Sequence, residues 1–432
     1  MDHHVAHKTP GVAEVTVLHV SQSDLNGGAA RAAYRLHRSL LDHGLESYMK
    51  VRIKQSDDWK VDGPVGKLSK VSSLLRPHLG GLAMRLQKSA NVNLHTGNWL
   101  PSAWSVELNA TDAGVLNLHW VGDETLSIED IGRIRKPMVW TLHDMWPFCG
   151  AEHYTADDEL ARWRTGYSKT NRPASEGGLD LDRLVWQRKC RAWKRPMHIV
   201  APSHWLASCA RESALFKGWP VSVIPNVLDT ATFQPLDQHF CRQALGLPNN
   251  DKQIILFGAL GGGGDPRKGY DLLLDALTQL GSRVDQQNML CVVFGQGTPQ
   301  IPYELPFHTR WMGHVRDDAT LALLYNAADV MVVPSRQENL PQTATESQAC
   351  GCPVVAFDCT GLRDAVVHRE TGYLARAFDV EDMAEGLRWI LEDAGRRDTL
   401  RQAARMRAVQ FWSPEVVVPQ YLSVYQSMIE HG

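Results

Sequence analysis

Short apolar runs rich in β-branched residues alternate with helical patterns along most of this chain. Each run ends in a polar turn, which is typical of parallel strands covered on both faces. The predicted strands span residues 15–20, 115–118, 138–142 and 198–201 in a first series, and 254–257, 289–294, 330–333 and 354–357 in a second. Helical patterns separate the strands, for example at 270–280 and 319–328. Two consecutive series predict an α/β protein with two doubly wound domains that face a shared cleft.

A cluster of proline and turn residues, PNVLDTATFQP at 225–235, separates the two series. Such a cluster is typical of a connection between domains. We therefore predict an N-terminal domain over residues 1–225 and a C-terminal domain over residues 226–411.

Composition excludes several functional classes. The 432 residues carry a formal net charge of −3, which gives no indication of a nucleic-acid-binding surface. No apolar run approaches the roughly 20 residues that cross a bilayer, and the first residues lack the apolar core of a signal peptide. The chain is therefore predicted to be cytoplasmic. Eight cysteines are scattered, and one close pair, Cys350 and Cys352, predicts neither a zinc site nor a disulfide framework.

Residues 65–90 combine leucines with lysines and arginines, among them Lys67 and Lys70. One interpretation is a basic amphipathic surface that meets anionic lipid. Pro77 and Gly80 interrupt a continuous apolar face, which favours the other interpretation, a helix packed on the protein with solvated lysines.

A long segment at 149–190 is rich in Trp, Tyr and Arg. Long loops at the mouth of an α/β cleft are often binding loops. The composition is equally compatible with a disordered or dimer-forming flap.

Two glycine-rich segments each lie between a predicted strand and a predicted helix. The first, NGGAAR, contains Gly27 and Gly28, whose backbone N–H groups are accessible to an anion at a helix N-terminus. The second, 258–269 (GALGGGGDPRKG), adds the cations Arg267 and Lys268. Neither segment matches a dinucleotide fingerprint or a P-loop. A tight turn and a flexible hinge therefore remain alternatives to phosphate binding.

His143 and Asp144 come directly after the predicted strand 138–142, and His119 with Trp120 ends a neighbouring strand. A histidine at the carboxyl end of a strand faces the cleft in this architecture, where it can donate to a hydroxyl or exchange a proton. The alternative is a histidine bonded to neighbouring backbone. Asp144 would fix the tautomer of His143 only if the two adjacent side chains did not diverge, as they usually do.

The segment 330–346, VMVVPSRQENLPQTATE, runs from a buried strand through a loop into a helix. Glu338 lies in the loop and Glu346 on the helix. Two carboxylates beside a helix N-terminus suit a phosphorylated, hydroxyl-rich ligand. A solvated helix face would explain Glu346 but explains Glu338 less well.

The start of that helix is predicted from capping preferences. Asn339 is expected to act as the N-cap, with Leu340 and Pro341 opening the helix. Free N–H groups of residues 340–343 would then point to the space between the two carboxylates.

Taken together, these motifs resemble the retaining glycosyltransferases of family 4, which have the GT-B architecture. The resemblance spans nearly the whole chain and is most specific in its C-terminal half. It is carried by NGGAAR, the HD of 143–144, the APS of 201–203, the IPN of 224–226, the RKG of 267–269, the FG of 294–295, the GHV of 313–315, the Glu338 and Glu346 segment, the CGCPVVA of 350–356 and the TGYL of 371–374. The stretches NLHWV and WTLHDMWPF resemble the subgroup that builds colanic-acid-like and other bacterial exopolysaccharides.

The resemblance implies two Rossmann-like domains, with a C-terminal helix at 412–432 packed back on the first. The donor, a UDP- or GDP-linked sugar, would bind mainly in the second domain. Glu346 would hold the ribose hydroxyls, while Glu338 and His143 would contact the transferred sugar as catalytic residues.

The same resemblance implies how the donor diphosphate would be held. Arg267 and Lys268 would neutralise it, and Gly27 with Gly28 would close over it from the first domain. N–H groups in the loop of Asn339, Leu340 and Pro341 would orient the sugar and its phosphate. The acceptor would come from the first domain.

The chain departs from the family pattern in three places. Ala259 follows Gly258 where the family usually has arginine, which removes one expected phosphate contact. Valine replaces the glycine of the family's IPNG motif. Cys149 and Cys190 alone remain of the cysteines that are frequent in the 149–190 segment.

The function implied is a retaining hexosyltransferase that moves a sugar to a glycan or lipid-linked acceptor in bacterial cell-surface polysaccharide biosynthesis. It would need no metal and no further cofactor, and it would contact the cytoplasmic face of the inner membrane peripherally. Two alternatives remain: a non-catalytic subunit that binds sugar nucleotides, and a GT-B sugar-nucleotide epimerase.

Overall fold

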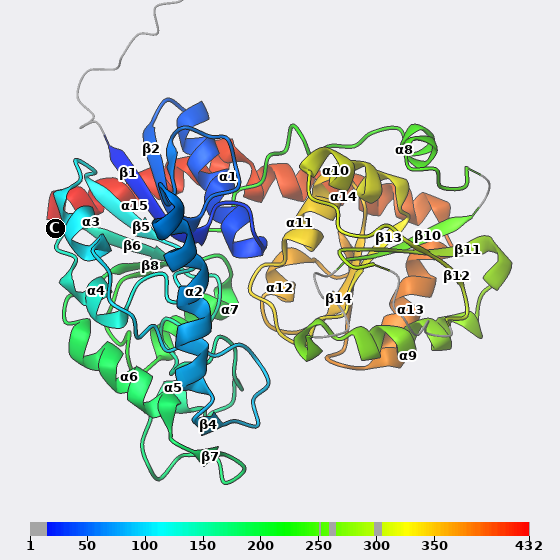
Figure 1. The fold of residues 1–432 in the computed structure, drawn as a ribbon. Helices are drawn as coiled ribbons and strands as arrows, with labels where there is room; N and C mark the ends of the chain where they lie inside the picture. Colours follow the sequence, from blue (N-terminus) through cyan, green and yellow to red (C-terminus); the bar gives the residue numbers. More distant parts are fainter. Residues whose placement is uncertain (1–14, 250–251, 259–264, 298–304, 432) are drawn as a thin grey trace, which may run out of the picture.

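The computed structural model describes residues 15–249, 252–258, 265–297 and 305–431. Two expectations concern residues outside this description: that residues 1–14 form no signal peptide, and that residues 259–264 of the second glycine-rich segment contribute to a phosphate site. The ribbon divides into two lobes, each built on a parallel sheet with helices on its faces (Figure 1). We call residues 15–223 the first lobe and residues 238–412 the second lobe.

The sheet of the first lobe has the order β3-β2-β1-β5-β6-β8-β9, and its neighbouring strands are parallel. Its strands are β1 (Thr16–Ser23), β2 (Glu46–Ile53), β3 (Val61–Asp62), β5 (Val115–Leu118), β6 (Met138–Thr141), β8 (His198–Ala201) and β9 (Val221–Val223). Its helices are α1 (Gly28–Asp42), α2 (Lys67–Met84), α3 (Trp104–Ala110), α4 (Ile128–Arg133), α5 (Arg162–Thr165), α6 (Leu181–Ala192) and α7 (His204–Glu212). A short antiparallel pair joins β4 (Gln87–Lys88) to β7 (Gly177–Gly178).

The sheet of the second lobe has the order β12-β11-β10-β13-β14-β15, again parallel. Its strands are β10 (Gln253–Gly258), β11 (Met289–Phe294), β12 (His308–Trp311), β13 (Val330–Val333), β14 (Val354–Phe357) and β15 (Gly372–Ala375). Its helices are α8 (Gln238–Ala244), α9 (Tyr270–Gly281), α10 (Asp318–Ala327), α11 (Gln342–Ala349), α12 (Leu362–Ala365), α13 (Val380–Leu391) and α14 (Ala394–Trp412), with short 3-10 turns at Pro266–Lys268 and Gln286–Asn288.

Each sheet reverses its winding beside a central strand. In the first lobe the reversal lies between β1 and β5, and in the second it lies between β10 and β13. Ligands of doubly wound sheets bind beside this reversal, outside the carboxyl ends of the strands. The fold therefore places the loops after these strands where a ligand would be held.

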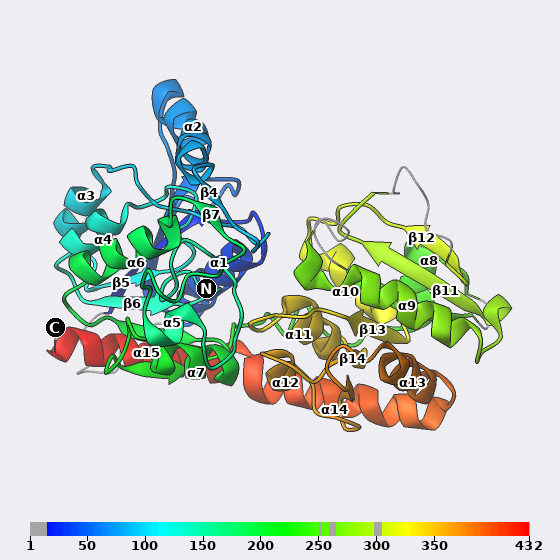
Figure 2. The same ribbon diagram turned by 90° about the horizontal axis from the view of Figure 1, so that it is seen from below.

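The last helix, α15 (Pro414–His431), lies against the first lobe although it follows α14 of the second (Figures 1 and 2). Its Tyr421 and Tyr425 are fully buried in a cluster with residues of the first sheet. Asn117 Nδ2 of β5 donates to Tyr425 Oη at 2.7 Å. The helix thus fastens the end of the chain to the sheet of the first lobe.

The two predicted strand series are confirmed, and β5, β8, β11, β13 and β14 have the predicted bounds. The strands that the sequence did not predict include β2, inside the first sheet, and β9, β12 and β15 at sheet edges. Strand β2 alternates buried with partly or fully exposed positions, so it lacks the continuous apolar run of the predicted strands. Edge strands can carry charged side chains, which interrupt such a run.

The 149–190 segment packs into the first lobe, so the disordered flap considered from the sequence is wrong. Trp163 and Tyr167 are buried in the main core of that lobe. Lys189 is also buried, and its ammonium donates to the carbonyls of Cys149 (3.1 Å) and Gly150 (2.8 Å). Burial lowers the pKa of Lys189 to about 7. All eight cysteines are free thiols, as predicted.

The packing expected for residues 65–90 is wrong. Helix α2 runs through Pro77 without a break, and Ser73 and Gly80 are its buried residues. Its leucines are exposed instead, and the helix stands out from the first lobe (Figure 2). Among the described residues, no helix combines the length and the apolar character that crossing a bilayer demands.

Candidate functional site

Two adjoining cavities open between the lobes, at the carboxyl ends of both sheets. The smaller has a volume of ≈ 330 Å³ and the larger ≈ 820 Å³. Of the residues singled out in the sequence, Gly28, His143, Arg267, Lys268, Glu338, Asn339, Leu340 and Pro341 line the smaller cavity, and Gly27, Gly28 and Glu346 line the larger. The structure therefore brings all of these residues together, at the positions that the strand order favours.

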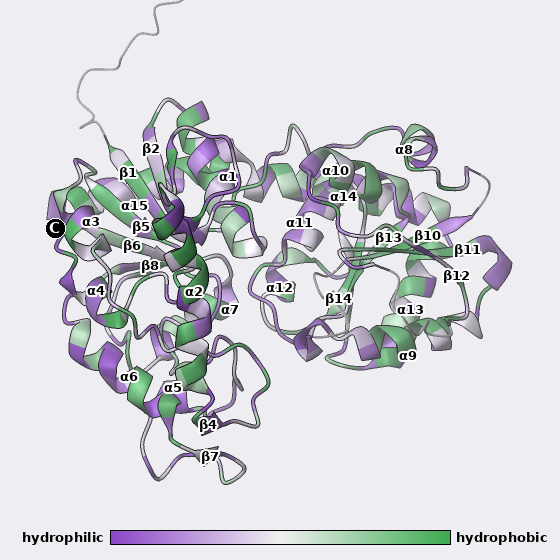
Figure 3. Cartoon of the chain, viewed as in Figure 1, coloured by the Kyte–Doolittle hydropathy of each residue, from purple (hydrophilic) through white to green (hydrophobic). Residues whose placement is uncertain are grey.

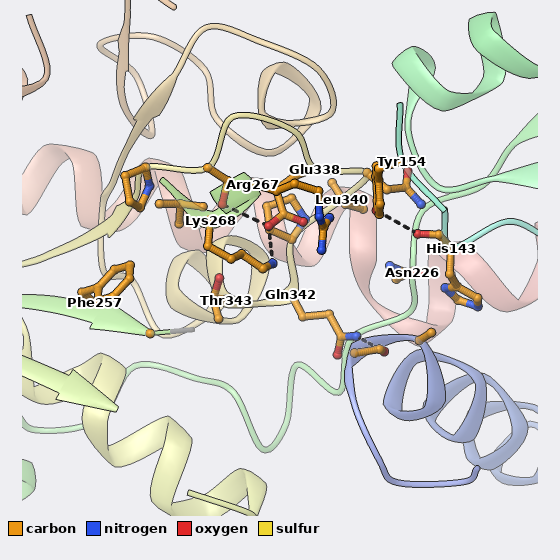
Figure 4. Close-up of a pocket in the computed structure, with 18 residues that line it drawn as sticks. His143, Tyr154, Asn226, Phe257, Arg267, Lys268, Glu338, Leu340, Gln342 and Thr343 are labelled. Atoms are coloured by element: carbon orange, nitrogen blue, oxygen red, sulfur yellow. Dashed lines mark hydrogen bonds and ion pairs between the residues drawn. The ribbon is translucent and has the colours of Figure 1, made fainter. Parts of the chain in front are cut away.

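Lys268 and Glu338 form an ion pair at the centre of the smaller cavity (Figure 4). The Lys268 ammonium lies 2.5 Å from Glu338 Oε1, which also accepts from Ser335 Oγ at 3.0 Å. Glu338 is 8% exposed. An anionic ligand that entered the cavity would find a cation already held in place by a carboxylate.

Arg267 is a second cation at the same wall. Its guanidinium lies 4.1 Å from the ring centre of Tyr154, which belongs to the first lobe, and 2.6 Å from Asp265. Burial alone lowers the pKa of Arg267, but Tyr154 and Glu338 raise it above its ordinary value. Arg267 therefore stays charged. The sequence marks Tyr154 only as one aromatic residue of the 149–190 segment.

Helix α11 begins two residues later than predicted, at Gln342. Pro341 takes the N-cap position without a side-chain cap, so the expected cap by Asn339 is wrong. The Asn339 side chain instead accepts from Ser203 Oγ (2.8 Å) and donates to the carbonyl of Leu142 (3.2 Å), both in the first lobe. Pro341 also has no N–H, so it cannot supply one of the expected backbone donors.

Two glycines allow the loops of the second lobe to meet. A Cβ on Gly361 would lie 1.2 Å from the carbonyl oxygen of Asn339, and a Cβ on Gly269 would lie 2.0 Å from that of Pro334. Gly269 also has a φ of 63°, in the left-handed region that favours glycine. Both loops that carry the cavity's charges are thus held at backbone contact distance.

Glu346 is buried in the larger cavity with both carboxylate oxygens in use. Oε1 accepts from Arg35 Nη1 at 2.7 Å, and Oε2 accepts from Tyr325 Oη at 2.7 Å. Arg35 belongs to α1 of the first lobe, and it also donates to Asp318 (3.0 Å) and Gln342 (2.8 Å) of the second. Burial lowers the pKa of Arg35, but the carboxylates raise it above its ordinary value.

Arg35 is therefore the main charged contact by which α1 meets the second lobe. In the sequence it is one arginine of an amphipathic helix, and no motif marks it. Tyr325 likewise belongs to the helical pattern at 319–328. Sequence reasoning missed both residues because their partner lies in another part of the chain.

Three histidines form a chain from the smaller cavity into the first lobe. His143 Nε2 lies 3.1 Å from His119 Nδ1, and His119 Nε2 lies 2.9 Å from His19 Nδ1. The three come from β1 and from the ends of β5 and β6, which are neighbours in the sheet. His119, a weaker candidate in the sequence, is thus linked to His143, whereas His19 was not anticipated.

Asp144 does not bond to His143. Its carboxylate accepts from His153 Nδ1 (2.6 Å) and Trp120 Nε1 (2.7 Å). The expected divergence of adjacent side chains is confirmed, and the tautomer of His143 is set by His119 instead.

His19 is the inner end of the histidine chain, and its protonation decides which ring donates each hydrogen bond along the chain. Within the described residues, His19 Nε2 is buried without a hydrogen-bond partner. A proton on Nδ1 of His19 has an acceptor in His119, whereas a proton on Nε2 would have none among the described residues, so we assign the proton to Nδ1. His19 then donates to His119, and His119 donates to His143 Nε2. The remaining proton of His143 lies on Nδ1, the ring atom that is left for a ligand.

Carboxylates close enough to share a metal ion occur in the described part of the chain at Glu176, Asp180 and Asp182. None of the three lines either cavity. All three already have protein partners, because Glu176 pairs with Arg172, Asp180 pairs with Arg162 and Asp182 accepts from Gln87.

We expect the free energy of unfolding to fall as the pH is lowered from 6.5 to about 4. Burial lowers the pKa of His143 to about 4, and those of His19 and His119 well below 6.5. In this window the unfolded chain binds protons that the folded chain does not. As the pH falls below 6.5, each such histidine lowers the free energy of unfolding by about 1.4 kcal/mol per pH unit. Above pH 6.5 its contribution to stability is complete.

Urea unfolding across this pH range tests the expectation. His119→Gln should reduce the dependence on pH, whereas His431→Gln, at an exposed position, should leave it unchanged. An equal dependence in wild type and His119→Gln would mean that His119 is protonated in the folded protein.

Arg35→Ala is expected to loosen the contact between the lobes. It leaves Glu346 buried without its cation, which costs about 3–5 kcal/mol while the lobes stay docked. We therefore expect a larger radius of gyration in small-angle X-ray scattering and lower stability in urea. Arg38→Ala is the matched control, because Arg38 lies on the same helix and pairs with Asp42 and Asp58. An unchanged radius and stability in Arg35→Ala would contradict this role.

Comparison with known proteins agrees with this geometry. Residues 237–407 match the family model of glycosyl transferases group 1. The chain is 36% identical over 222 residues to D-inositol 3-phosphate glycosyltransferase of Jonesia denitrificans. The matched region covers 48% of this chain and 51% of that protein. It is 34% identical over 254 residues to D-inositol 3-phosphate glycosyltransferase 1 of Catenulispora acidiphila, covering 54% and 59%. The chain thus spans about half the length of the curated relatives it matches.

Solved structures resemble the chain over almost its whole length. Sucrose-phosphate synthase from Thermosynechococcus elongatus superimposes with a TM-score of 0.67 at 18% identity, covering 97% of this chain and 100% of that chain. HepE from Anabaena, in complex with UDP and glucose, gives 0.62 at 17% identity, with coverage of 96% and 100%. WaaG, a glycosyltransferase involved in lipopolysaccharide biosynthesis, gives 0.59 at 14% identity, with coverage of 96% and 100%.

These likenesses confirm the predicted GT-B fold. The two relatives named above are inositol phosphate glycosyltransferases, and the exopolysaccharide subgroup stays a prediction. Residues 237–407 thus match the glycosyl transferases group 1 model, and the chain has the GT-B fold.

Proposed function

We propose that the protein is a retaining glycosyltransferase that moves a sugar from a nucleotide-diphosphate donor to a glycan or lipid-linked acceptor. The observation that carries the proposal is the arrangement of Lys268, Glu338 and Glu346. They lie in adjoining cavities between the lobes, on the segments that follow β10 and β13 beside the winding reversal of the second sheet, Glu346 being on helix α11. The match of residues 237–407 to glycosyl transferases group 1 supports it independently.

In this proposal the donor occupies both cavities. The nucleoside takes the larger cavity, where its ribose hydroxyls share the Glu346 carboxylate with Arg35 and Tyr325. The diphosphate lies between Lys268 and the first turn of α11, whose N–H groups have no partner within the helix. The sugar then fills the smaller cavity.

The reaction breaks the bond between the anomeric carbon and the leaving phosphate oxygen, and it forms a bond from that carbon to the acceptor oxygen. Positive charge develops on the sugar and negative charge on the diphosphate. Lys268 and Arg267 stabilise the leaving group, because fixed cations in a site shielded from water need no reorganisation. The proton of the acceptor hydroxyl passes to the leaving phosphate, on the same face of the sugar. The proposal thus requires neither a bound metal nor a cofactor.

His143 contributes a neutral donor in this scheme. With its Nε2 engaged by His119, Nδ1–H is left to bond a hydroxyl of the transferred sugar. Burial holds the pKa of His143 at about 4, so the ring adds no charge beside the developing cation. A charged imidazolium at this place would oppose the reaction.

Bacterial cell-surface polysaccharide biosynthesis at the cytoplasmic face of the inner membrane is the pathway we propose, with the acceptor held by the first lobe. A second candidate is transfer to an inositol phosphate, which the names of the curated relatives favour. A panel of nucleotide sugars, tested with inositol phosphates and with lipid-linked acceptors, separates the two.

Lys268→Ala and Glu346→Gln are expected to lower donor turnover about a hundredfold or more, since each removes a preorganised contact with the donor. The measurement is hydrolysis or transfer from the donor that gives the largest thermal stabilisation of the wild type. Lys217→Ala, at an exposed lysine, is the control and should match the wild type.

The same assay distinguishes the alternatives. Wild-type turnover in Lys268→Ala would contradict the proposed site. Donor binding without any turnover in the wild type would favour a non-catalytic subunit. Loss of donor without a new glycosidic product would favour an epimerase.

A further inference from the structure

Helix α2 is held on the first lobe by its small and polar side. Arg76 donates to the main-chain carbonyls of Leu100 and of Glu124, the latter at 2.8 Å. A Cβ on Gly80 would lie 2.4 Å from Glu124 Oε1, so the helix approaches its support closely at this point. Ser73 is the other buried residue of the helix. The opposite side of α2 therefore points away from the lobe.

That opposite side carries a stripe of large apolar residues, which we call the leucine stripe. It consists of Leu68, Val71, Leu75, Leu79 and Leu82, which are 89%, 52%, 51%, 53% and 54% exposed. Spacings of three and four place these residues on one side of a helix. Figure 3 shows hydrophobic turns along α2 at the front of the first lobe, and Figure 2 shows the helix standing clear of it.

This orientation is the reverse of an ordinary surface helix, whose apolar side faces the core. Monomeric proteins rarely leave contiguous apolar surface of this kind in water, and where they do it marks an interaction site. The leucine stripe therefore requires an occupant.

The charges beside the stripe are all of one sign. Residues 64–90 contain no Asp or Glu but carry several lysines and arginines. Lys67, Lys70 and Arg85 are exposed, and none of them has a carboxylate partner within the described residues. Unpaired cations flanking an apolar stripe complement a surface that is both anionic and apolar.

A second copy of the chain fits this surface poorly. A two-fold contact pairs the same patch with itself, so the cations around one leucine stripe would face those around the other. Like charges brought together in this way oppose association. A bilayer with anionic headgroups offers phosphates to the cations and acyl chains to the leucines.

We propose that the leucine stripe docks the protein on an anionic phospholipid bilayer. The helix, about 27 Å long, lies in the plane of the interface with its leucines about 5–10 Å deep. Lys67, Lys70 and Arg85 reach the headgroup phosphates. This inference rests on the proposed function, because it specifies how the protein would contact the membrane. Vesicle binding is measured without sugar transfer, so the membrane proposal and the glycosyltransferase proposal can fail independently.

Co-sedimentation of the full chain with vesicles tests the proposal. We expect binding to vesicles of phosphatidylglycerol and phosphatidylcholine, and little binding to phosphatidylcholine alone. Leu75→Glu combined with Leu82→Glu should abolish sedimentation. Lys67→Gln combined with Lys70→Gln should weaken it about fivefold for each cation removed.

The matched control is Met406→Glu combined with Val409→Glu on α14, where both side chains are exposed (64% and 40%). It adds the same charge at an unrelated apolar position and should bind vesicles like the wild type. Circular dichroism and thermal unfolding confirm that each variant is folded, as the exposure of the substituted side chains leads us to expect.

Three results would overturn the proposal. The first is equal sedimentation of the wild type and the leucine-stripe variant with anionic vesicles, and the second is no sedimentation of the wild type. The third is a dimer in light scattering that the leucine-stripe variant converts to monomer, which would assign the stripe to a second copy of the chain.

Discussion

The ion pair between Arg35 and Glu346 is the contact on which the arrangement of the two lobes depends most. Both side chains are buried, and they come from opposite lobes, so each is compensated only while the lobes are docked. A buried charge without a partner is costly. The same guanidinium also reaches Asp318, which fixes the larger cavity from a second side. The position of the cavity walls thus follows from charge neutralisation between distant parts of the chain.

A second pair, Lys268 with Glu338, makes the smaller cavity a place where charge is already balanced. Glu346 and Glu338 are each matched by a cation before any ligand is present. A diphosphate with a sugar attached brings anionic and hydroxyl groups that can share these partners without leaving a buried charge alone. This is the physical reason why we propose a nucleotide sugar, and not a simple anion, as the ligand of the site.

Desolvation acts differently on the histidines and on α2. Inside the first lobe it keeps His19, His119 and His143 neutral, so the chain delivers a hydrogen-bond donor to the cavity without a charge. On α2, the close approach of Gly80 to Glu124 leaves the leucines in water. The histidines are held by contacts within the first lobe, whereas the leucine stripe faces solvent.

The sequence by itself determined the two strand series and the loops that line the cavities. Buried parallel strands must be apolar along their length, and their carboxyl ends meet at one edge of a sheet. That reasoning was sufficient to select Lys268, Glu338, Glu346 and His143. The same reasoning did not predict edge strands such as β12, because they are not required to be apolar.

Only the tertiary structure decided which distant residues complete the site. Arg35, Tyr325 and His19 sit in ordinary helical or strand patterns, and their roles arise from partners elsewhere in the chain. The side on which α2 docks was hidden for a related reason. Periodicity shows that a helix has an apolar side, but the contact of Gly80 with the Glu124 side chain decides whether that side is buried or left facing solvent.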